Sequence, residues 1–254
     1  MLYPMTFKPI LKKIIWGGSD ICPFKGITPV QEGIGESWEL SHVEGNYSVV
    51  DNGALEGKTL DELIRTYGKQ LLGEKVVEQF GSIFPLLIKF IDARDNLSIQ
   101  VHPDDELAKK RHNSFGKTEM WYVVDCDEGA TLLYGFKHEI TKEEFARRIA
   151  DNTLLEVTNA VPVKKGDVFF IKSGTLHAIG KGILIAEIQQ NSNTTYRIYD
   201  YGRVGKDGKP RELHVNKALD VTKLAPAEQY PETPVEKKDG YDIKLLSKCE
   251  YFTT

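Results

Sequence analysis

Residues 166–180 read GDVFFIKSGTLHAIG, which has the form of a strand followed by a turn that presents a histidine. The aromatic and branched run favours a strand that ends at Lys172. Ser173 and Gly174 then supply the turn, and His177 follows directly after it. A histidine in such a place is either a structural residue or a metal ligand, so its meaning depends on what accompanies it elsewhere in the chain.

Short strand-like runs with turns of Gly, Asp, Asn or Lys between most of them fill the middle of the chain. These runs are residues 84–92, 97–102, 120–125, 130–136, 167–173, 183–190 and 195–200. Many short strands with few helices are typical of an antiparallel sandwich or barrel. The sequence therefore predicts a mainly β fold, with a few helices at its periphery.

Helix signals occur in few places. The pairs Thr59 with Glu62 and Thr141 with Glu144 have the spacing of capping boxes. We expect the main helices at residues 59–80, 141–150 and 211–223. The acidic residues 104–106, which follow Pro103, predict the first turn of another short helix.

The stretch SIQVHPDD, residues 98–105, places three polar residues at alternate positions of a predicted strand. Successive side chains of a strand point to opposite faces, so Ser98, Gln100 and His102 share one face. Glu119 begins another predicted strand. Such a polar face is either solvated or the lining of a pocket.

Composition excludes several classes of function. The chain has 254 residues, 41% hydrophobic and 28% charged, with a formal net charge of −4. With no basic excess, a nucleic-acid partner is not expected. Three scattered cysteines without CxxC spacing fit a reducing compartment. Without a signal peptide or a run of about 20 apolar residues, we expect a soluble cytoplasmic protein with no membrane partner.

His102, Glu119 and His177 are metal-ligand types in strand context. Two imidazoles and a carboxylate, completed by the amide oxygen of Gln100 or by water, could hold Zn²⁺ with an open catalytic position. Other divalent metals would accept the same donors, so residue types alone do not identify the metal.

Residues 166–180 also carry a family signature. Gly166, Gly174 and His177 have the spacing of the second motif of cupin barrels, although Lys172 stands where proline is usual. The order LSIQVHPDD, GKTEMWYVV, GTLHAIG and TYRIYDYGR resembles type I mannose-6-phosphate isomerases (phosphomannose isomerases) of the short bacterial form, in the cupin superfamily. The resemblance covers most of residues 1–220.

This resemblance implies a cupin-type antiparallel β-barrel or jelly roll and a metal-dependent aldose–ketose isomerase. Such an enzyme interconverts mannose 6-phosphate and fructose 6-phosphate through an enediol intermediate, so the partner would be a hexose 6-phosphate. The resemblance implies one Zn²⁺ per chain, with the ligands Gln100, His102, Glu119 and His177. It also implies phosphate contacts from Ser98 and Lys89, and an active-site arginine at Arg197.

The general base stays open between Glu187, Lys117 and a metal-bound water. A structural alternative for Glu187 is an ion pair with Arg197 across adjacent strands. The competing functions are a non-catalytic sugar-phosphate-binding cupin and an iron-dependent oxygenase. An intact set of Arg197, Glu187 and metal ligands argues against mere binding, and the lack of an HxH pair argues against the oxygenase.

We expect three parts along the chain: a cupin-type catalytic domain at 1–224, a Pro-, Glu- and Lys-rich linker at 225–240, and the start of a C-terminal β segment at 241–254. The metal site would lie within residues 98–203. The last segment indicates either a naturally short form or a truncated one. A monomer or weak homo-oligomer is expected.

Overall fold

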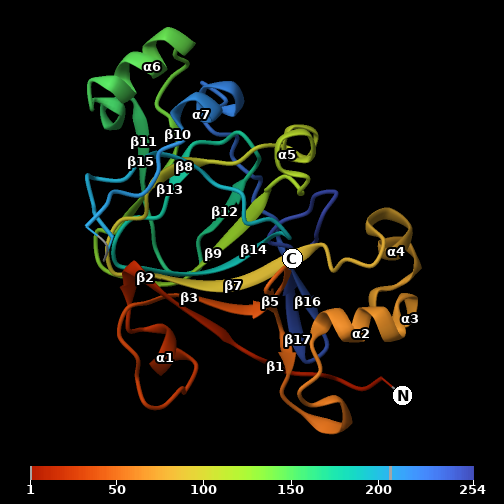
Figure 1. The fold of residues 1–254 in the computed structure, drawn as a ribbon. Coiled ribbons are helices and arrows are strands. Elements are labelled where there is room, and N and C mark those ends of the chain that lie inside the picture. Colours follow the sequence, from red (N-terminus) through yellow and green to blue (C-terminus); the bar gives the residue numbers. More distant parts are fainter. Residues whose placement is uncertain (1, 206–207) are drawn as a thin grey trace.

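The computed structural model describes residues 2–205 and 208–254, and two antiparallel sheets dominate it (Figure 1). One sheet has six strands in the order β12 (Val168–Ile171), β9 (Glu119–Cys126), β14 (Ile183–Gln190), β7 (Leu86–Ala93), β2 (Ile10–Gly18) and β3 (Ile34–Leu40). The other has five, in the order β11 (Thr158–Pro162), β10 (Thr131–Phe136), β13 (His177–Ala178), β8 (Ile99–Val101) and β15 (Tyr196–Tyr199). The predicted mainly β, antiparallel fold is confirmed.

Smaller elements surround the two sheets. Three strand pairs stand apart from them: β1 (Phe7–Lys8) with β6 (Val49–Val50), β4 (His42–Val43) with β5 (Asn46–Tyr47), and β16 (Val235–Lys238) with β17 (Tyr241–Lys244). The α-helices are α1 (Ile21–Phe24), α2 (Leu60–Tyr67), α3 (Lys69–Leu72), α4 (Glu74–Phe80), α5 (Asp105–His112), α6 (Lys142–Ala150) and α7 (Val215–Val221). Two 3-10 turns, η1 (Gly53–Leu55) and η2 (Leu154–Glu156), complete the described elements.

The main core lies between the two sheets. Trp121 and Ile185 contribute to it from the six-stranded sheet, and Leu132 from the five-stranded sheet. Because side chains alternate along a strand, Met120 points to the other face of β9, where it packs with Phe170 and Phe252. The six-stranded sheet thus buries apolar side chains on both of its faces.

A second core covers the outer face of the five-stranded sheet. There α6 and α7, at the top of Figure 1, pack through Phe145 and Ala218 against Ile99 and Tyr196. The side chain of Phe145 is fully buried, and its ring meets that of Phe136 edge-on, with 5.7 Å between the ring centroids. This cluster fixes α6 on the sheet.

We expect Phe145→Ala to lower the free energy of unfolding by about 3–5 kcal/mol, because it removes a buried aromatic ring and leaves a cavity. Phe24→Ala is the control, since half of the Phe24 side chain is exposed, and it should cost less than about 1 kcal/mol. Thermal or urea unfolding of both variants provides the measurement. Equal losses would show that the second core does not hold α6.

The prediction of one helix over 59–80 is wrong. The capping box of Thr59 and Glu62 is present, but the segment forms three short helices, α2 to α4. The breaks fall at Gly68 and Gly73, whose φ angles are 45° and 87°. Glycine adopts such angles without a Cβ clash, and they end a right-handed helix.

One further prediction needs correction, and three strands were not predicted. The helix expected over 211–223 is confined to α7, and the sequence patterns did not reveal β2, β3 and β11. By contrast, Thr141 caps α6 through its side chain, as predicted. The short helix expected to start at 104–106 also forms, with Asp104 as its N-cap and Asp105 as the first residue of α5.

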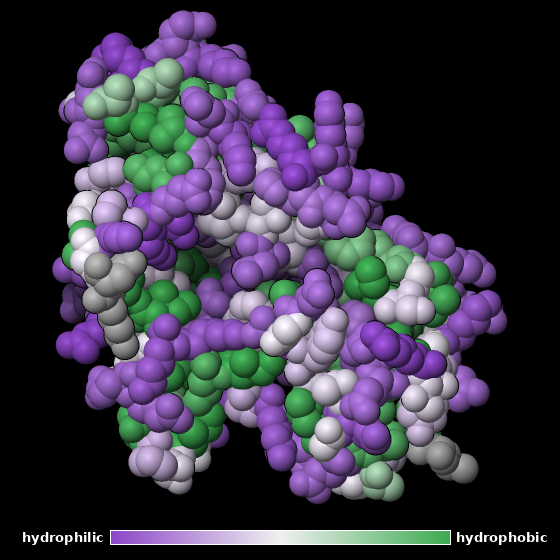
Figure 2. All heavy atoms as spheres, in the orientation of Figure 1, coloured by the Kyte–Doolittle hydropathy of each residue, from purple (hydrophilic) through white to green (hydrophobic). Residues whose placement is uncertain are grey.

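The C-terminal region lies against the six-stranded sheet through Phe252, and β16 begins within the residues predicted as a linker. The division at 224 and 240 stays a prediction. Among the described residues, the helices are all too short or too polar to cross a membrane. Hydrophilic residues cover most of the face in Figure 2, and hydrophobic residues form smaller groups on it.

Candidate metal centre and active-site cavity

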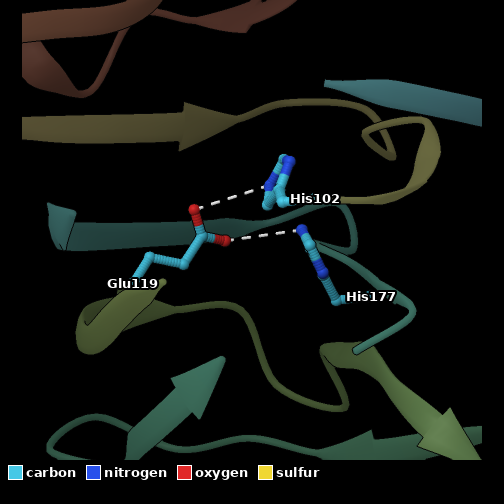
Figure 3. A group of neighbouring side chains, drawn as sticks. All are labelled: His102, Glu119 and His177. Atoms are coloured by element: carbon cyan, nitrogen blue, oxygen red, sulfur yellow. Dashed lines mark ion pairs between the residues drawn. The ribbon is translucent and has the colours of Figure 1, made fainter. Parts of the chain in front are cut away.

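Three buried side chains from both sheets converge on one point (Figure 3). His102 follows β8, Glu119 begins β9, and His177 begins β13. Nε2 of His102 lies 3.6 Å from Oε2 of Glu119, and Nε2 of His177 lies 3.4 Å from Oε1 of the same carboxylate. The candidate ligand atoms all lie within 4.8 Å of one another. The chain therefore brings three predicted ligands together.

The turn before His177 is built by backbone contacts. Gly174 has a φ of 83°, and a Cβ there would lie 2.8 Å from the carbonyl oxygen of Val221. Its N–H donates to the carbonyl of His102 at 2.8 Å. Glycine is thus required both by conformation and by space, and the turn links the backbones that carry the two histidines.

Backbone carbonyls orient both imidazoles. Nδ1 of His102 lies 3.1 Å from the carbonyl oxygen of Thr194, and Nδ1 of His177 lies 2.8 Å from that of Thr175. A carbonyl oxygen only accepts hydrogen bonds, so Nδ1 carries the hydrogen in each ring. The lone pair of each Nε2 is then directed toward the carboxylate of Glu119. Metal-binding histidines usually have this form, in which one ring nitrogen donates to a backbone carbonyl and the other keeps its lone pair for the metal.

Three buried polar atoms of the cluster have no hydrogen-bond partner among the described residues. Nε2 of His102 and both carboxylate oxygens of Glu119 are buried there without a hydrogen bond. Leaving such atoms unsatisfied in the interior is costly. A divalent cation would satisfy them all, so the donor set fits a metal ion.

Burial also disfavours charge in this cluster. It lowers the pKa of His177 to about 4, and it lowers the pKa of His102 well below its usual value. Burial, with the negative charge of Glu187 added, raises the pKa of Glu119 to about 8. The histidines are therefore neutral at physiological pH, which is the form that binds metals.

A row of side chains crosses the five-stranded sheet beside this cluster. His177 is paired with Gln100, and Gln100 with Arg197. Directly paired residues of antiparallel strands point to the same face. Nε2 of the Gln100 amide lies 3.3 Å from Nε2 of His177. Gln100 is thus next to the cluster, and its amide is close enough to serve as a further ligand of a metal ion bound there.

A cavity of about 530 Å³ adjoins the cluster. Ser98 and Gln100 line it, so the polar face of β8 and the residues before it form a pocket wall, as one of the two readings of this face predicted. Six cationic side chains also line the cavity: Lys12, Lys13, Lys89, Lys117, Arg197 and Arg211. The cavity is suited to a polar, anionic molecule of small size.

Lys89 and Glu187 form a buried ion pair across neighbouring strands. Nζ of Lys89 lies 3.1 Å from Oε1 of Glu187 and 3.4 Å from Oε1 of Glu36. Burial alone would lower the pKa of Lys89, but these carboxylates outweigh it and raise the pKa. The residues next to Lys89 in LLIKFID (86–92) are so apolar that its ammonium needs a specific partner, and Glu187 and Glu36 are its partners.

The alternative pairing of Glu187 with Arg197 is wrong, because β14 and β15 belong to different sheets. Besides Lys89, Glu187 binds Trp121, whose Nε1–H donates to Oε2 at 2.8 Å. Burial alone would raise the pKa of Glu187. The positive charges of Lys89 and Lys117, with the hydrogen bonds from Lys89 and Trp121, instead hold this pKa below its usual value.

Lys117 and Arg197 reach the cavity from different elements. Nζ of Lys117 lies 3.5 Å from Oε2 of Glu119, so its ammonium is next to the cluster. Arg197 donates from Nη1 to the carbonyl of Glu212 at 2.9 Å. Burial and the neighbouring Arg211 lower the pKa of the Arg197 guanidinium.

Sequence reasoning missed several residues of the cavity wall. Lys12, Lys13 and Asn46 line the cavity from the N-terminal part of the chain, as do Glu36 and Trp38. Glu36 and Trp38 lie in GESWELS, residues 35–41, where no site residue was predicted. Arg211 also lines the cavity, and Asp200 orients it by accepting a hydrogen bond of 2.7 Å from its Nε. Nothing in the local pattern around Arg211 marks it as a site residue.

Known proteins resemble this chain over nearly its whole length. The family model of the phosphomannose isomerase type I catalytic domain matches residues 5–130. The chain is 42% identical to mannose-6-phosphate isomerase ManA of Bacillus subtilis, with 98% of this chain and 78% of that protein covered. It is 42% identical to the mannose-6-phosphate isomerase of Streptococcus mutans, with 100% and 78% covered. The crystal structure of the mannose 6-phosphate isomerase from B. subtilis matches at 38% identity with a TM-score of 0.91, covering 98% of this chain and 78% of that chain.

Proposed function

The chain belongs to the type I phosphomannose isomerase family, and from this premise we propose that it interconverts mannose 6-phosphate and fructose 6-phosphate. The observation that carries the proposal is the buried cluster of His102, Glu119 and His177 beside a cavity lined by cations. In the direction of fructose 6-phosphate, the C2–H bond breaks and a C1–H bond forms while the carbonyl moves from C1 to C2. No external oxidant or reductant is needed.

We propose one Zn²⁺ per chain, held by His102, Glu119 and His177, with Gln100 as a fourth protein ligand. Support comes from the unsatisfied buried atoms of the cluster and from its two neutral imidazoles. Other divalent ions accept the same donors, so the metal itself has to be determined by titration. When bound, the ion supplies a Lewis acid for the sugar oxygens that gain negative charge.

The side chains around the cavity supply the remaining chemistry. Arg197 would stabilise the negative charge that develops on O1 or O2 as the enediolate forms, because a fixed guanidinium acts strongly in a cavity with restricted water. Lys117 and Glu187 both line the cavity and can transfer a proton between C2 and C1. We propose these three as the catalytic side chains.

The phosphate group would bind at the cationic wall of the cavity. The hydroxyl of Ser98 and the ammonium of Lys89 are the proposed contacts. The charge of Lys89 is already shared by Glu187 and Glu36. We therefore propose that Lys12 and Arg211, which line the same cavity, contribute the positive charge that Lys89 alone does not provide.

A non-catalytic sugar-phosphate-binding protein is the second candidate. Binding alone requires the cationic wall, but it does not require Lys117 and Glu187 to lie beside a buried metal cluster. The isomerase therefore accounts for more of the arrangement.

Metal removal is expected to abolish isomerase activity, because the Lewis acid contributes several kcal/mol to transition-state stabilisation. Fructose 6-phosphate formation from mannose 6-phosphate is measured before chelation, after chelation, and after stepwise addition of Zn²⁺ or another divalent ion. Activity should return with about one ion per chain. An oxygen-free assay serves as a control and should give the same rate.

Folded, zinc-loaded protein without turnover would contradict the isomerase proposal. If such protein still binds mannose 6-phosphate in calorimetry, the binding protein becomes the better description.

The state and place of the protein are also proposals. We propose a monomer or weak homo-oligomer in the cytoplasm, organised as a catalytic domain over 1–224 and a linker over 225–240. The cysteines Cys22, Cys126 and Cys249 are free thiols in the structure, which agrees with a reducing compartment.

A further inference from the structure

The segment 113–118 connects α5 to β9 and carries Lys117, two residues before Glu119. It has no regular secondary structure of its own, yet Gly116, Lys117 and Thr118 are buried. The N–H of Lys117 donates to the carbonyl of Pro103 at 3.1 Å. The placement of two site residues therefore depends on how this segment is held.

Asp105 and Gln190 hold the segment on both sides of Lys117. Oδ1 of Asp105 accepts the N–H of Gly116 at 2.7 Å. Oε1 of Gln190 accepts the N–H of Thr118 at 2.9 Å, and the N–H of Gln190 donates to the carbonyl of Thr118 at 3.2 Å. The Nε2 of Gln190 also donates to Oδ1 of Asp105 at 3.0 Å, so the two side chains that bind the segment also bind each other.

Gly116 lies tightly against the start of α5. A Cβ at this position would lie 2.5 Å from the backbone nitrogen of Asp105 and 2.6 Å from the carbonyl carbon of Asp104. The segment thus has no free space on this side, and a shift of Asp105 would move it directly.

Tyr251, far away in the chain, holds Asp105 from outside. Its hydroxyl donates to Oδ2 of Asp105 at 2.6 Å. The next residue, Phe252, is buried and packs with Met120, which follows Glu119. The C-terminal residues therefore fix the carboxylate that grips Gly116 and the strand that starts with Glu119.

We propose that Asp105, Gln190 and Tyr251 are positioning residues of the isomerisation, which fix Lys117 and Glu119 at the metal centre without touching substrate. This inference rests on the roles of Lys117 and Glu119 in the proposed function. Small displacements of reacting groups cost large factors in rate, while they leave binding by the rest of the cavity intact.

The first test compares Tyr251→Phe with Tyr230→Phe. Each variant removes one tyrosine hydroxyl that forms a hydrogen bond. The hydroxyl of Tyr230 binds the backbone of Lys248 in the C-terminal region. Of these two tyrosines, Tyr251 is the one whose hydroxyl binds Asp105. We expect Tyr251→Phe to lower kcat about tenfold with KM nearly unchanged, and Tyr230→Phe to stay within about twofold of the parent protein.

Hydrogen exchange gives a readout that does not depend on activity. In the metal-loaded protein, the amides of residues 113–118 should exchange faster in Tyr251→Phe than in the parent protein or in Tyr230→Phe. If the parent protein proves inactive, the isomerase proposal fails, while the exchange comparison still tests whether Tyr251 holds the segment.

The second test exchanges Asp105 itself. Asp105→Ala removes every bond to Gly116, Gln190 and Tyr251, and it should lower kcat about 10–100-fold. Asp105→Asn keeps an acceptor for Gly116 and can donate to the hydroxyl of Tyr251, so kcat should recover to within about threefold of the parent.

Two results would overturn the proposal: equal kcat and equal exchange in Tyr251→Phe and Tyr230→Phe, or no recovery of kcat in a folded Asp105→Asn. If Asp105→Ala fails to fold, the tyrosine pair alone decides.

Discussion

Replacing His177 by alanine is expected to lower kcat/KM for mannose 6-phosphate by about 1,000-fold or more, because the cluster loses one of its two imidazoles. A Lewis acid that contributes several kcal/mol to the barrier corresponds to a factor of this size. The lone pair of Nε2 is directed at the carboxylate of Glu119, since Nδ1 is bound to the carbonyl of Thr175. We also expect the dissociation constant for Zn²⁺ to rise at least about 100-fold.

His138→Ala is the matched control, because it is the same substitution at an exposed histidine. It should leave both the metal affinity and the rate unchanged. Metal content, zinc titration and steady-state kinetics are measured on both variants after thermal unfolding has shown that they fold. Full activity and full metal content in His177→Ala would remove this residue from the metal centre.

The second large effect is expected at Lys117. Lys117→Met keeps the length of the stem and removes the ammonium, and we expect kcat to fall by about 10²–10⁴-fold, the usual contribution of a proton-transfer group. Glu187→Gln should lower kcat less. The two carboxylate oxygens of Glu187 already lie at Trp121 and Lys89, at 2.8 and 3.1 Å.

The two variants also differ in stability. Glu187→Gln leaves the buried ammonium of Lys89 with Glu36 as its remaining carboxylate partner among the described residues. Leaving a buried charge with no partner costs about 3–5 kcal/mol. Because Glu36 remains, we expect a smaller loss of unfolding free energy, which thermal unfolding would detect. The control for the loss of kcat in Lys117→Met is Lys172→Met, which should keep the parent kcat because Lys172 pairs with Glu228 at the surface.

A larger loss of kcat in Glu187→Gln than in Lys117→Met would contradict this assignment and move proton transfer to the carboxylate. Deuterium incorporation from D₂O into the product distinguishes the steps further. A variant that has lost its proton-transfer group should show slowed incorporation as well as slowed turnover.

Helix starts and the faces of strands could be predicted from the sequence because they depend on residues that are close together in the chain. The acidic residues 104–106 and the cap Thr141 mark the starts of α5 and α6, and both helices begin where these residues indicated. Alternation along residues 98–102 indicated a common face for Ser98 and Gln100, and both line the cavity. Donor types in strand context singled out His102, Glu119 and His177 as candidate ligands, and the family resemblance implied that they form one set.

Pairing between strands was not readable in the same way. The sequence allowed Glu187 to pair with Arg197, and the structure pairs it with Lys89. Strand order joins β14 to β7 and β9, and it places β15 in the other sheet. The helix over 59–80 failed for a different reason, because its apolar spacing continues through Gly68 and Gly73 while the backbone turns there.

By itself, therefore, the sequence determined the β class, the starts of α2, α5 and α6, the metal-type residues and the family resemblance. These rest on residue types and spacing within short stretches and, for the resemblance, on the order of such stretches along the chain. Only the tertiary structure decided the partners of Lys89, the cationic wall that includes Lys12 and Arg211, and the hold of Tyr251 on Asp105. These contacts join residues far apart in the chain, and sheet order and packing set them. Any one stretch is compatible with many such partners, and the fold as a whole selects one.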